Sequence, residues 1–170
     1  NYMNCRNLLA VVISLTLMAL CTAVEGKNPK WSPAGDKIMT QWGETLDPEN
    51  VLQEYPRPQM MRDRWVNLNG LWDYAITPID AVPEKMDGQI LVPFAVESAL
   101  SGVGRAVTEN DALWYEREFR LPKDWKGDRI KLNFGAVDFK AEVYVDGKKA
   151  GEHTGGYAPF SFDITAALNA

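Results

Sequence analysis

The stretch of this chain with the most chemical potential runs from Glu152 to Thr165. It holds His153, the only histidine, followed by Gly155-Gly156 and Tyr157. A histidine can exchange a proton near neutral pH, but one that ends a hairpin strand is more often a structural hydrogen-bonding residue. The glycine pair lacks the strand-to-helix context of a phosphate loop and indicates a tight turn. We keep His153 and Tyr157 as candidate substrate-binding residues and expect His153 to be mainly structural.

Two arginines are the next candidates. Arg117 shares one face of an alternating stretch with apolar residues, and a buried guanidinium needs a carboxylate or several carbonyl partners. We predict a structural ion pair from Arg117 to Asp138 or Glu97. Arg105 lies in a polar loop from Glu97 to Asp111, and long irregular loops in compact domains are often functional.

Metal, cofactor and thiol chemistry find little support in the sequence. The carboxylates of Glu109 and Asp111 lack the regular spacing of a calcium loop, which favours a solvated loop over a cation site. No stretch matches a cofactor motif, so we expect no metal and no cofactor. The cysteines, Cys5 and Cys21, both fall within residues 1–23, which are expected to be an export signal, and this leaves the rest of the chain without thiols.

The elements that must position these side chains are strands, because apolar residues recur at every second position from Trp65 onward. Pro93 and Pro122 each end a strand, and Asp146-Gly147 is a dipeptide typical of a two-residue hairpin turn. Short strands without a convincing amphipathic helix predict an antiparallel β-sandwich. The predicted strands are 68–76, 89–92, 114–121, 130–134, 139–145, 148–152 and 160–164, and a terminal turn follows over 166–168.

Composition excludes some classes of partner. The chain is 46% hydrophobic and 24% charged, as a globular protein is, and its formal net charge is -5. Without a basic field to attract phosphate backbones, nucleic acid is not expected as a partner.

The N-terminal segment, residues 1–23, has the features of an export signal. Arg6 gives a positive flank, residues 8–20 are almost all apolar, and small residues end at Ala23. The apolar run is shorter than the roughly 20 residues of a membrane span. Cys21 offers a lipoprotein signal as the alternative, which the bulky Leu20 before it disfavours. We therefore expect an exported protein, periplasmic or extracellular, without a membrane span.

Residues 24–60 read as an extended arm, since five prolines interrupt any regular element. A short helix is expected from Asp47 to Glu54, with Asp47 as its cap and Pro48 at its first position. The large aromatic residues of the arm, Trp31, Trp42 and Tyr55, are expected to lie against a neighbouring surface.

Several motifs from residue 60 to residue 168 occur in one characteristic order. They are Leu68-Asn69-Gly70-Leu71-Trp72, Val92-Pro93, Leu113-Trp114-Tyr115-Glu116-Arg117-Glu118-Phe119, Val143-Tyr144-Val145-Asp146-Gly147 and His153-Thr154-Gly155-Gly156-Tyr157-Ala158-Pro159-Phe160. The series resembles the N-terminal sugar-binding domain of glycoside hydrolase family 2, the β-galactosidase and β-glucuronidase family. The last motif is closer to the β-glucuronidase branch.

The resemblance implies a galactose-binding-domain-like jelly roll over residues 61–170, with its C-terminal strands missing. An immunoglobulin-like domain and a (β/α)8 barrel would follow in the complete protein. Such enzymes hydrolyse terminal β-linked sugars with retention, using two glutamates about 5 Å apart. In the family these glutamates belong to the barrel, so no residue of this chain is expected to be catalytic and the fragment alone should be inactive.

The same analogy bears on individual residues. Arg105 could reach into the sugar pocket of the barrel and contact an acidic sugar. Alternatively, its loop could merely pack on another domain. Gly155 stands where the large β-galactosidases carry an aspartate that contacts sugar, which argues against galactose specificity.

Two functions stay open at this point. One is the non-catalytic N-terminal domain of an exported retaining exo-β-glycosidase, of β-galactosidase or β-glucuronidase type. The other is a free-standing carbohydrate-binding module without hydrolytic activity, because jelly rolls commonly bind sugars through exposed aromatic residues. A carbohydrate is the expected ligand in both, and a homo-oligomer is left open.

Overall fold

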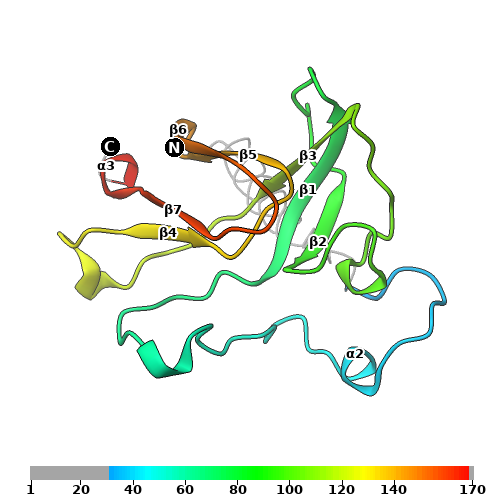
Figure 1. Cartoon of the computed structure of the whole chain (residues 1–170), viewed down its shortest axis with the longest axis horizontal. Coiled ribbons are helices and arrows are strands. Elements are labelled where there is room, and N and C mark those ends of the chain that lie inside the picture. The colour runs from blue at the N-terminus through cyan, green and yellow to red at the C-terminus, as the bar shows by residue number, and fades with distance from the viewer. Residues whose placement is uncertain (1–30, 169–170) are drawn as a thin grey trace, which may run out of the picture. The chain divides into compact units, whose positions relative to one another are not determined.

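The computed structural model describes residues 31–168 and divides the chain at Glu118 into two units. The export signal predicted at 1–23 lies outside the described residues. Every strand pair in both units is antiparallel, which confirms the predicted all-β antiparallel class (Figure 1). Within 31–168, no helix has the length and apolar character needed to cross a membrane.

A three-stranded sheet forms the centre of the first unit. Its strands are β1 (Gly70–Pro78), β2 (Gly88–Val92) and β3 (Asp111–Glu116), in the order β2-β1-β3, drawn in green in Figure 1. The strand β1 is central because its first half pairs with β2 and its second half with β3. The predictions of strands at 68–76 and 89–92 are thus confirmed within two residues, whereas the strand predicted from 114 to 121 ends at Glu116.

The core of the first unit lies on both faces of this sheet. Ile90 and Leu91 are neighbours on β2 and point to opposite faces, yet both are 0% exposed. Ala75 of β1 is 1% exposed although alternation places it opposite the larger apolar residues of that strand. The sheet is therefore covered on both sides, and strict alternation does not describe it.

The arm before the sheet contains less helix than predicted, and at a different place. The helix α2 (Gln41–Glu44) begins at the N-cap Thr40, whose hydroxyl accepts a hydrogen bond from the Gly43 amide. The helix predicted from Asp47 to Glu54 is wrong: Asp47 caps a single turn, and Leu52 has a φ of 45°, which a right-handed helix does not allow. The 3-10 helix η1 (Pro58–Met60) follows.

Arm aromatics differ in their surroundings. Tyr55 packs edge-on against Trp65 with 4.8 Å between ring centroids, as expected of an arm that lies on a surface. Trp42 is 73% exposed, so the expectation that it is covered is wrong within the described chain.

The second unit consists of two strand pairs. β4 (Lys131–Phe134) pairs with β7 (Phe160–Asp163), and β5 (Lys140–Val145) pairs with β6 (Lys148–Thr154). Two short helices flank them, η3 (Lys123–Trp125) and α3 (Thr165–Leu168). The hairpin between β5 and β6 turns at Asp146 and Gly147, both with positive φ, which confirms the predicted turn.

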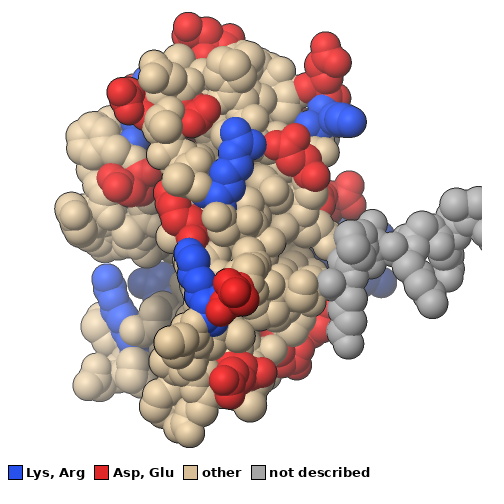
Figure 2. Space-filling model, turned by 90° about the vertical axis from the view of Figure 1, so that its right-hand side faces the viewer, with Lys and Arg blue, Asp and Glu red and all other residues tan. Residues whose placement is uncertain are grey.

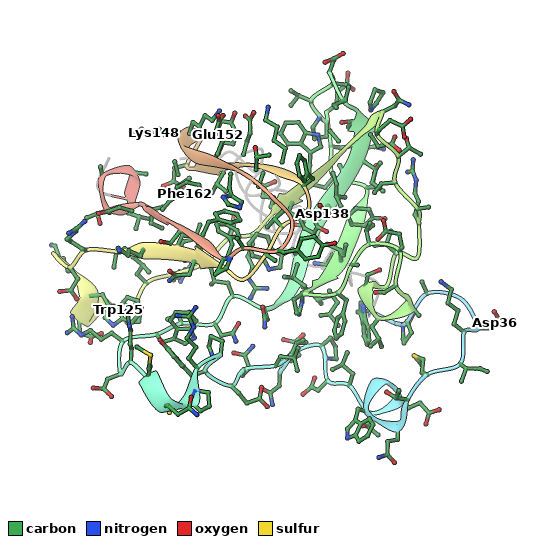
Figure 3. The ribbon with its side chains drawn as sticks, viewed as in Figure 1. Asp36, Trp125, Asp138, Lys148, Glu152 and Phe162 are labelled. Carbon is green, nitrogen blue, oxygen red and sulfur yellow. The ribbon has the colours of Figure 1, made fainter. Side chains whose placement is uncertain are left out.

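Aromatic rings hold the second unit together. Phe160 of β7 stacks on Phe134 of β4 at 4.8 Å between centroids, and Phe162 meets Phe160 edge-on. Gly151 of β6 is the residue that lets Phe162 approach, because a Cβ there would overlap the Phe162 ring. Figure 3 labels Phe162 where it lies beside the β5–β6 hairpin.

Charged side chains are mixed on the face drawn in Figure 2. Lysine and arginine are interspersed there with aspartate and glutamate and do not gather into one basic patch. The lack of a basic patch on this face agrees with the formal net charge of -5.

Candidate functional site

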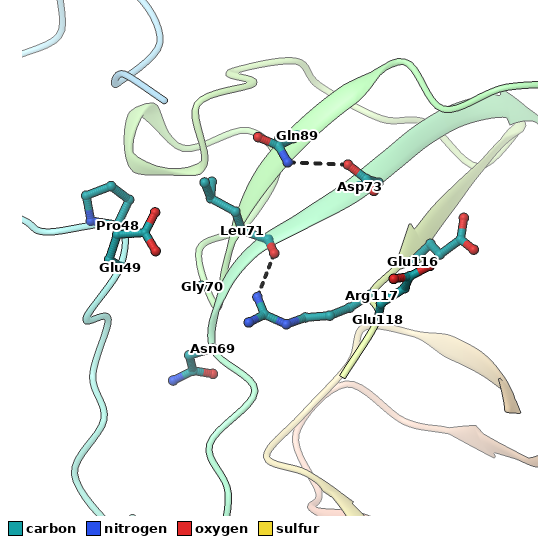
Figure 4. Close-up of a pocket in the computed structure, with 10 residues that line it drawn as sticks. All are labelled: Pro48, Glu49, Asn69, Gly70, Leu71, Asp73, Gln89, Glu116, Arg117 and Glu118. Carbon is teal, nitrogen blue, oxygen red and sulfur yellow. Dashed lines mark hydrogen bonds between the residues drawn. The ribbon is translucent and has the colours of Figure 1, made fainter. Parts of the chain in front are cut away.

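A polar cavity of about 380 Å³ lies in the first unit, where β1 begins and β3 ends (Figure 4). The arm supplies one wall and the three-stranded sheet supplies the rest. The lining residues are Pro48, Glu49, Asn69, Gly70, Leu71, Asp73, Gln89, Glu116, Arg117 and Glu118. They come from four separate stretches of the chain, which the pairing of β1 with both of its neighbours brings together.

Arg117 contributes the only basic side chain to this cavity lining. Its Nη1 donates a hydrogen bond to the Leu71 carbonyl at 2.6 Å. This bond links the residue directly after β3 to the backbone of β1. The guanidinium also lies over Gly70, where a Cβ would come within 3.2 Å of Nη1. Gly70 has a φ of 126°, which glycine adopts readily and other residues do not.

The partner of Arg117 is therefore a backbone carbonyl. Among residues 31–168 it forms no ion pair with Glu97, so that part of the prediction is wrong. Arg117 is half-buried and lines the open cavity, and this partial exposure lowers the need for a charged partner. Asp138 belongs to the second unit, and a pairing with it stays a prediction.

Acidic residues outnumber Arg117 in the lining. Four carboxylates belong to it, those of Glu49, Asp73, Glu116 and Glu118, although Glu116 turns away from the cavity in Figure 4. The Asp73 carboxylate accepts a long hydrogen bond, 3.5 Å, from Nε2 of Gln89 on β2. Such a lining offers many acceptors and a few donors to a ligand and carries a net negative charge. No three acidic, histidine or cysteine side chains within the described range are grouped to hold a metal ion.

Asn69, the residue directly before β1, is fixed on one side of the cavity. Its amide nitrogen Nδ2 donates to the Leu52 carbonyl at 3.3 Å, and its backbone N–H donates to the Asn67 side chain at 2.8 Å. The wall made by the arm is thus tied to residues that precede β1. The sequence predicts none of the cavity residues other than Arg117 as site residues, because no local sequence pattern marks them.

Arg105 does not line this cavity. It is exposed, and its backbone N–H donates to the Val96 carbonyl at 3.2 Å. Nearby, hydrogen bonds from Thr108 lower the pKa of the Asp111 carboxyl, to which Arg105 adds a smaller electrostatic contribution. Whether Arg105 contacts a sugar stays a prediction.

The loop that carries Arg105 is organised by Ser101, which is 0% exposed. The Ser101 hydroxyl contacts the carbonyls of Val96 and Ser98 at 3.0 and 2.8 Å and accepts hydrogen bonds from the amides of Val103 and Gly104. A serine at this position looks unremarkable in the sequence, so its role could not be predicted.

His153 belongs to the second unit and lies in β6. Its ring stacks on Phe160 with 4.2 Å between centroids and 15° between planes. Its Nε2 is buried and makes no hydrogen bond within the described part of the chain. The contact agrees with a structural role for His153 through ring packing, whereas the expected side-chain hydrogen bond is absent at Nε2.

Two exposed aromatic residues lie at one end of the β5–β6 hairpin. Tyr157 is 99% exposed and Phe139 is 65% exposed. Their loops are joined by a hydrogen bond of 2.8 Å from the Gly155 amide to the Phe139 carbonyl. The Asp138 carboxylate, labelled in Figure 3, lies close to Gly156 of the neighbouring loop, within 2.5 Å of where a Cβ would stand. The sequence pattern places Phe139 on the buried face of its strand, but the strand begins one residue later and leaves this ring outside.

Comparisons with known proteins agree with these features. Residues 90–170 match the model described as "Glycosyl hydrolases family 2, sugar binding domain". The chain is 30% identical over 118 residues to a β-glucuronidase of Paenibacillus borealis, which covers 65% of this chain and 20% of that protein. It is 46% identical over 52 residues to a β-galactosidase of Thermoanaerobacter pseudethanolicus, over 31% of this chain and 7% of that protein.

The same likeness is found among solved structures. The Faecalibacterium prausnitzii β-glucuronidase superposes with a TM-score of 0.51 and 25% sequence identity, over 67% of this chain and 20% of that one. The chain thus spans a fifth or less of the length of the relatives named here. By sequence match and by fold, residues 90–170 are similar to the sugar-binding domain of glycosyl hydrolases family 2.

Proposed function

We propose that the chain is the non-catalytic N-terminal part of an exported, retaining exo-β-glycosidase of β-glucuronidase or β-galactosidase type. The observation that carries the proposal is the match of residues 90–170 to the sugar-binding domain of family 2. The relatives are named as β-glucuronidases and β-galactosidases, and each is several times longer than this chain.

In this proposal the two units form a jelly roll that braces a catalytic barrel through an immunoglobulin-like domain. Two glutamates of the barrel hydrolyse the terminal O-glycosidic bond, the first as acid and base and the second as nucleophile. Residues of this chain contribute support, and Arg105 is the residue proposed to reach toward the sugar. Export rests on the apolar segment before Ala23.

Hydrolysis assays test the proposal. The purified chain and the whole gene product that contains it are incubated with the p-nitrophenyl β-D-glucuronide and β-D-galactoside. We expect release of p-nitrophenol by the whole product and none by the chain alone. Hydrolysis by the chain itself would show that catalysis resides here, and an inactive whole product would refute the glycosidase assignment. N-terminal sequencing of the secreted form tests export, with Val24 expected as the first residue.

A carbohydrate-binding module without hydrolytic activity is the second candidate function. The exposure of Tyr157 and Phe139 on joined loops favours it, because aromatic rings stack on the apolar face of sugar rings. If this candidate holds, the purified chain binds the β-glycosides without hydrolysing them and replacing Tyr157 with alanine abolishes that binding, whereas no binding by the unchanged chain would refute it.

A further inference from the structure

We propose that the turn Asp146-Gly147 is a site of spontaneous covalent modification, at which the aspartate converts into isoaspartate. The proposal goes beyond the function proposed above and does not depend on hydrolysis of a glycoside. It rests on the chemistry of aspartate and asparagine followed by glycine, on the geometry of this turn, and on the contacts that restrain the other such pairs of the chain.

The conversion needs only the peptide and water. The backbone nitrogen of Gly147 attacks the side-chain Cγ of Asp146, and the new N–C bond closes a succinimide ring. The hydroxyl of the protonated carboxyl leaves with the proton of that nitrogen, as water. A second water then opens the ring, and when it attacks the main-chain carbonyl of Asp146 the chain continues through Cγ as isoaspartate. Glycine in the second position favours the attack, because no Cβ shields its nitrogen.

The sequence contains three pairs of this kind, which are Asn69-Gly70, Asp87-Gly88 and Asp146-Gly147. The attack requires the side chain and the following peptide to rotate toward each other, so hydrogen bonds that fix either group slow it. In the first pair both groups are fixed. Nδ2 of Asn69 donates to the Leu52 carbonyl at 3.3 Å, and Gly70 pairs with Val92 inside the three-stranded sheet.

The second pair, Asp87-Gly88, is held in a similar way. The Asp87 carboxylate accepts a hydrogen bond of 2.9 Å from the Ile76 amide, and the Asp87 N–H donates to the Tyr74 carbonyl at 2.7 Å. Gly88 pairs with Tyr74 at the start of β2. Attack at this pair therefore requires the carboxylate to leave Ile76 and the end of β2 to separate from β1.

The third pair, Asp146-Gly147, lacks these restraints. Both residues are exposed, and among residues 31–168 no hydrogen bond or ion pair holds the Asp146 carboxylate. A Cβ at Gly147 would meet no atom within 4 Å, so the peptide has room to rotate. The pairing of Val145 with Lys148 closes the turn, and Figure 3 labels Lys148 at this end of the hairpin. Opening a two-residue turn breaks fewer contacts than opening the sheet around the other pairs.

The modification should loosen the end of the hairpin. Isoaspartate carries the main chain through one extra carbon, and a two-residue turn fits the twist of its strands only with the ordinary backbone. The pairing of Val145 with Lys148 and of Tyr144 with Lys149 should therefore weaken. Lys149 also contacts the Glu142 carboxylate of β5 at 3.3 Å, an ion pair that depends on the same strand pairing.

Ageing of the purified full chain in ¹⁸O-labelled water tests the proposal. Asp87 is the matched control for Asp146, because both are aspartates followed by glycine. Peptide mass spectrometry with electron-transfer fragmentation measures the isoaspartate and the label at each position. We expect both to accumulate at least fivefold faster at Asp146 than at Asp87 in the folded chain, and at similar rates in urea. Equal rates in the folded chain, or no label at Asp146 while the unfolded chain is labelled, would overturn the proposal.

Two variants of the turn extend the test. Asp146→Asn keeps a residue that suits the turn, and this asparagine should lose ammonia at least fivefold faster than Asn69 in the same molecule. Asp146→Gly also suits the turn but has no side chain to be attacked, so it should fold and gain no label at this position. After ageing, the wild type should lose amide signals of Lys148 and Lys149 that the glycine variant retains. Slower deamidation at position 146 than at Asn69 would refute the site, and equal loss of these signals in both proteins would refute its effect on the hairpin.

Discussion

The core position of Ile90 leads to a quantitative prediction about stability. Ile90 is 0% exposed in the middle of β2, and Ile90→Ala removes a methylene and two methyl groups from it. At roughly 0.8 kcal/mol for each buried group, the lost transfer free energy is about 2.4 kcal/mol. The cavity left behind adds to this, so the free energy of unfolding should fall by about 3–4 kcal/mol, within the range of about 2–5 kcal/mol known for such changes.

Urea unfolding followed by tryptophan fluorescence measures the loss. With a denaturant slope of about 2 kcal/mol per M, the midpoint should fall by roughly 1.5–2 M. The chain offers a matched control in Ile38→Ala, because Ile38 is 103% exposed in the arm. That control should change the free energy of unfolding by less than about 0.5 kcal/mol. A loss below about 1 kcal/mol for Ile90→Ala, or equal losses for the two variants, would refute the assignment of β2 to the core.

Two further predictions concern the second unit. Gly151→Ala should destabilise it by about 1–3 kcal/mol, because the new methyl group overlaps the Phe162 ring; thermal unfolding checks this against Gly135→Ala, where nothing lies within 4 Å of the new Cβ. The pKa of the Asp163 carboxyl lies well below its ordinary 3.8, chiefly because the Thr165 hydroxyl donates to it. The stabilising effect of the Asp163 carboxylate is therefore complete at pH values above the ordinary pKa, and it is lost as the pH falls toward the lowered pKa. Asp163→Asn should accordingly lose less stability than the wild type between about pH 5 and pH 2 in urea midpoints, and equal losses would contradict the prediction.

Local patterns in the sequence were enough to predict most strands. Alternation located β1 and β2 within two residues, and Asp146-Gly147 located the hairpin turn, because both depend on neighbours along the chain. The helix expected at Asp47 failed for a reason that lies elsewhere in the fold. Val51 is 0% exposed, and the adjacent Leu52 takes a positive φ where the arm buries Val51.

The candidate site was much harder to predict than the strands. Glu49 and Arg117 line the same cavity although 68 positions separate them, and no spacing rule connects such residues. The sequence pattern singles out Arg117 but predicts an ion pair, because the observed partner, the carbonyl of Leu71, is a backbone group without a side-chain signature. Phe139 was misplaced because β5 begins one residue later than its apolar pattern suggests.

The hydrogen bonds around Ser101 divide the loop between β2 and β3 into a hydrogen-bonded base and an exposed tip. The hydroxyl gathers backbone groups from Val96 to Gly104, whereas the stretch from Arg105 to Asn110 is largely exposed. Changes of length or sequence in the exposed half can therefore occur without disturbing the sheet. The loop is built so that new contacts can be acquired at its tip while its base keeps one shape, which also makes it the natural place for inserting an engineered peptide.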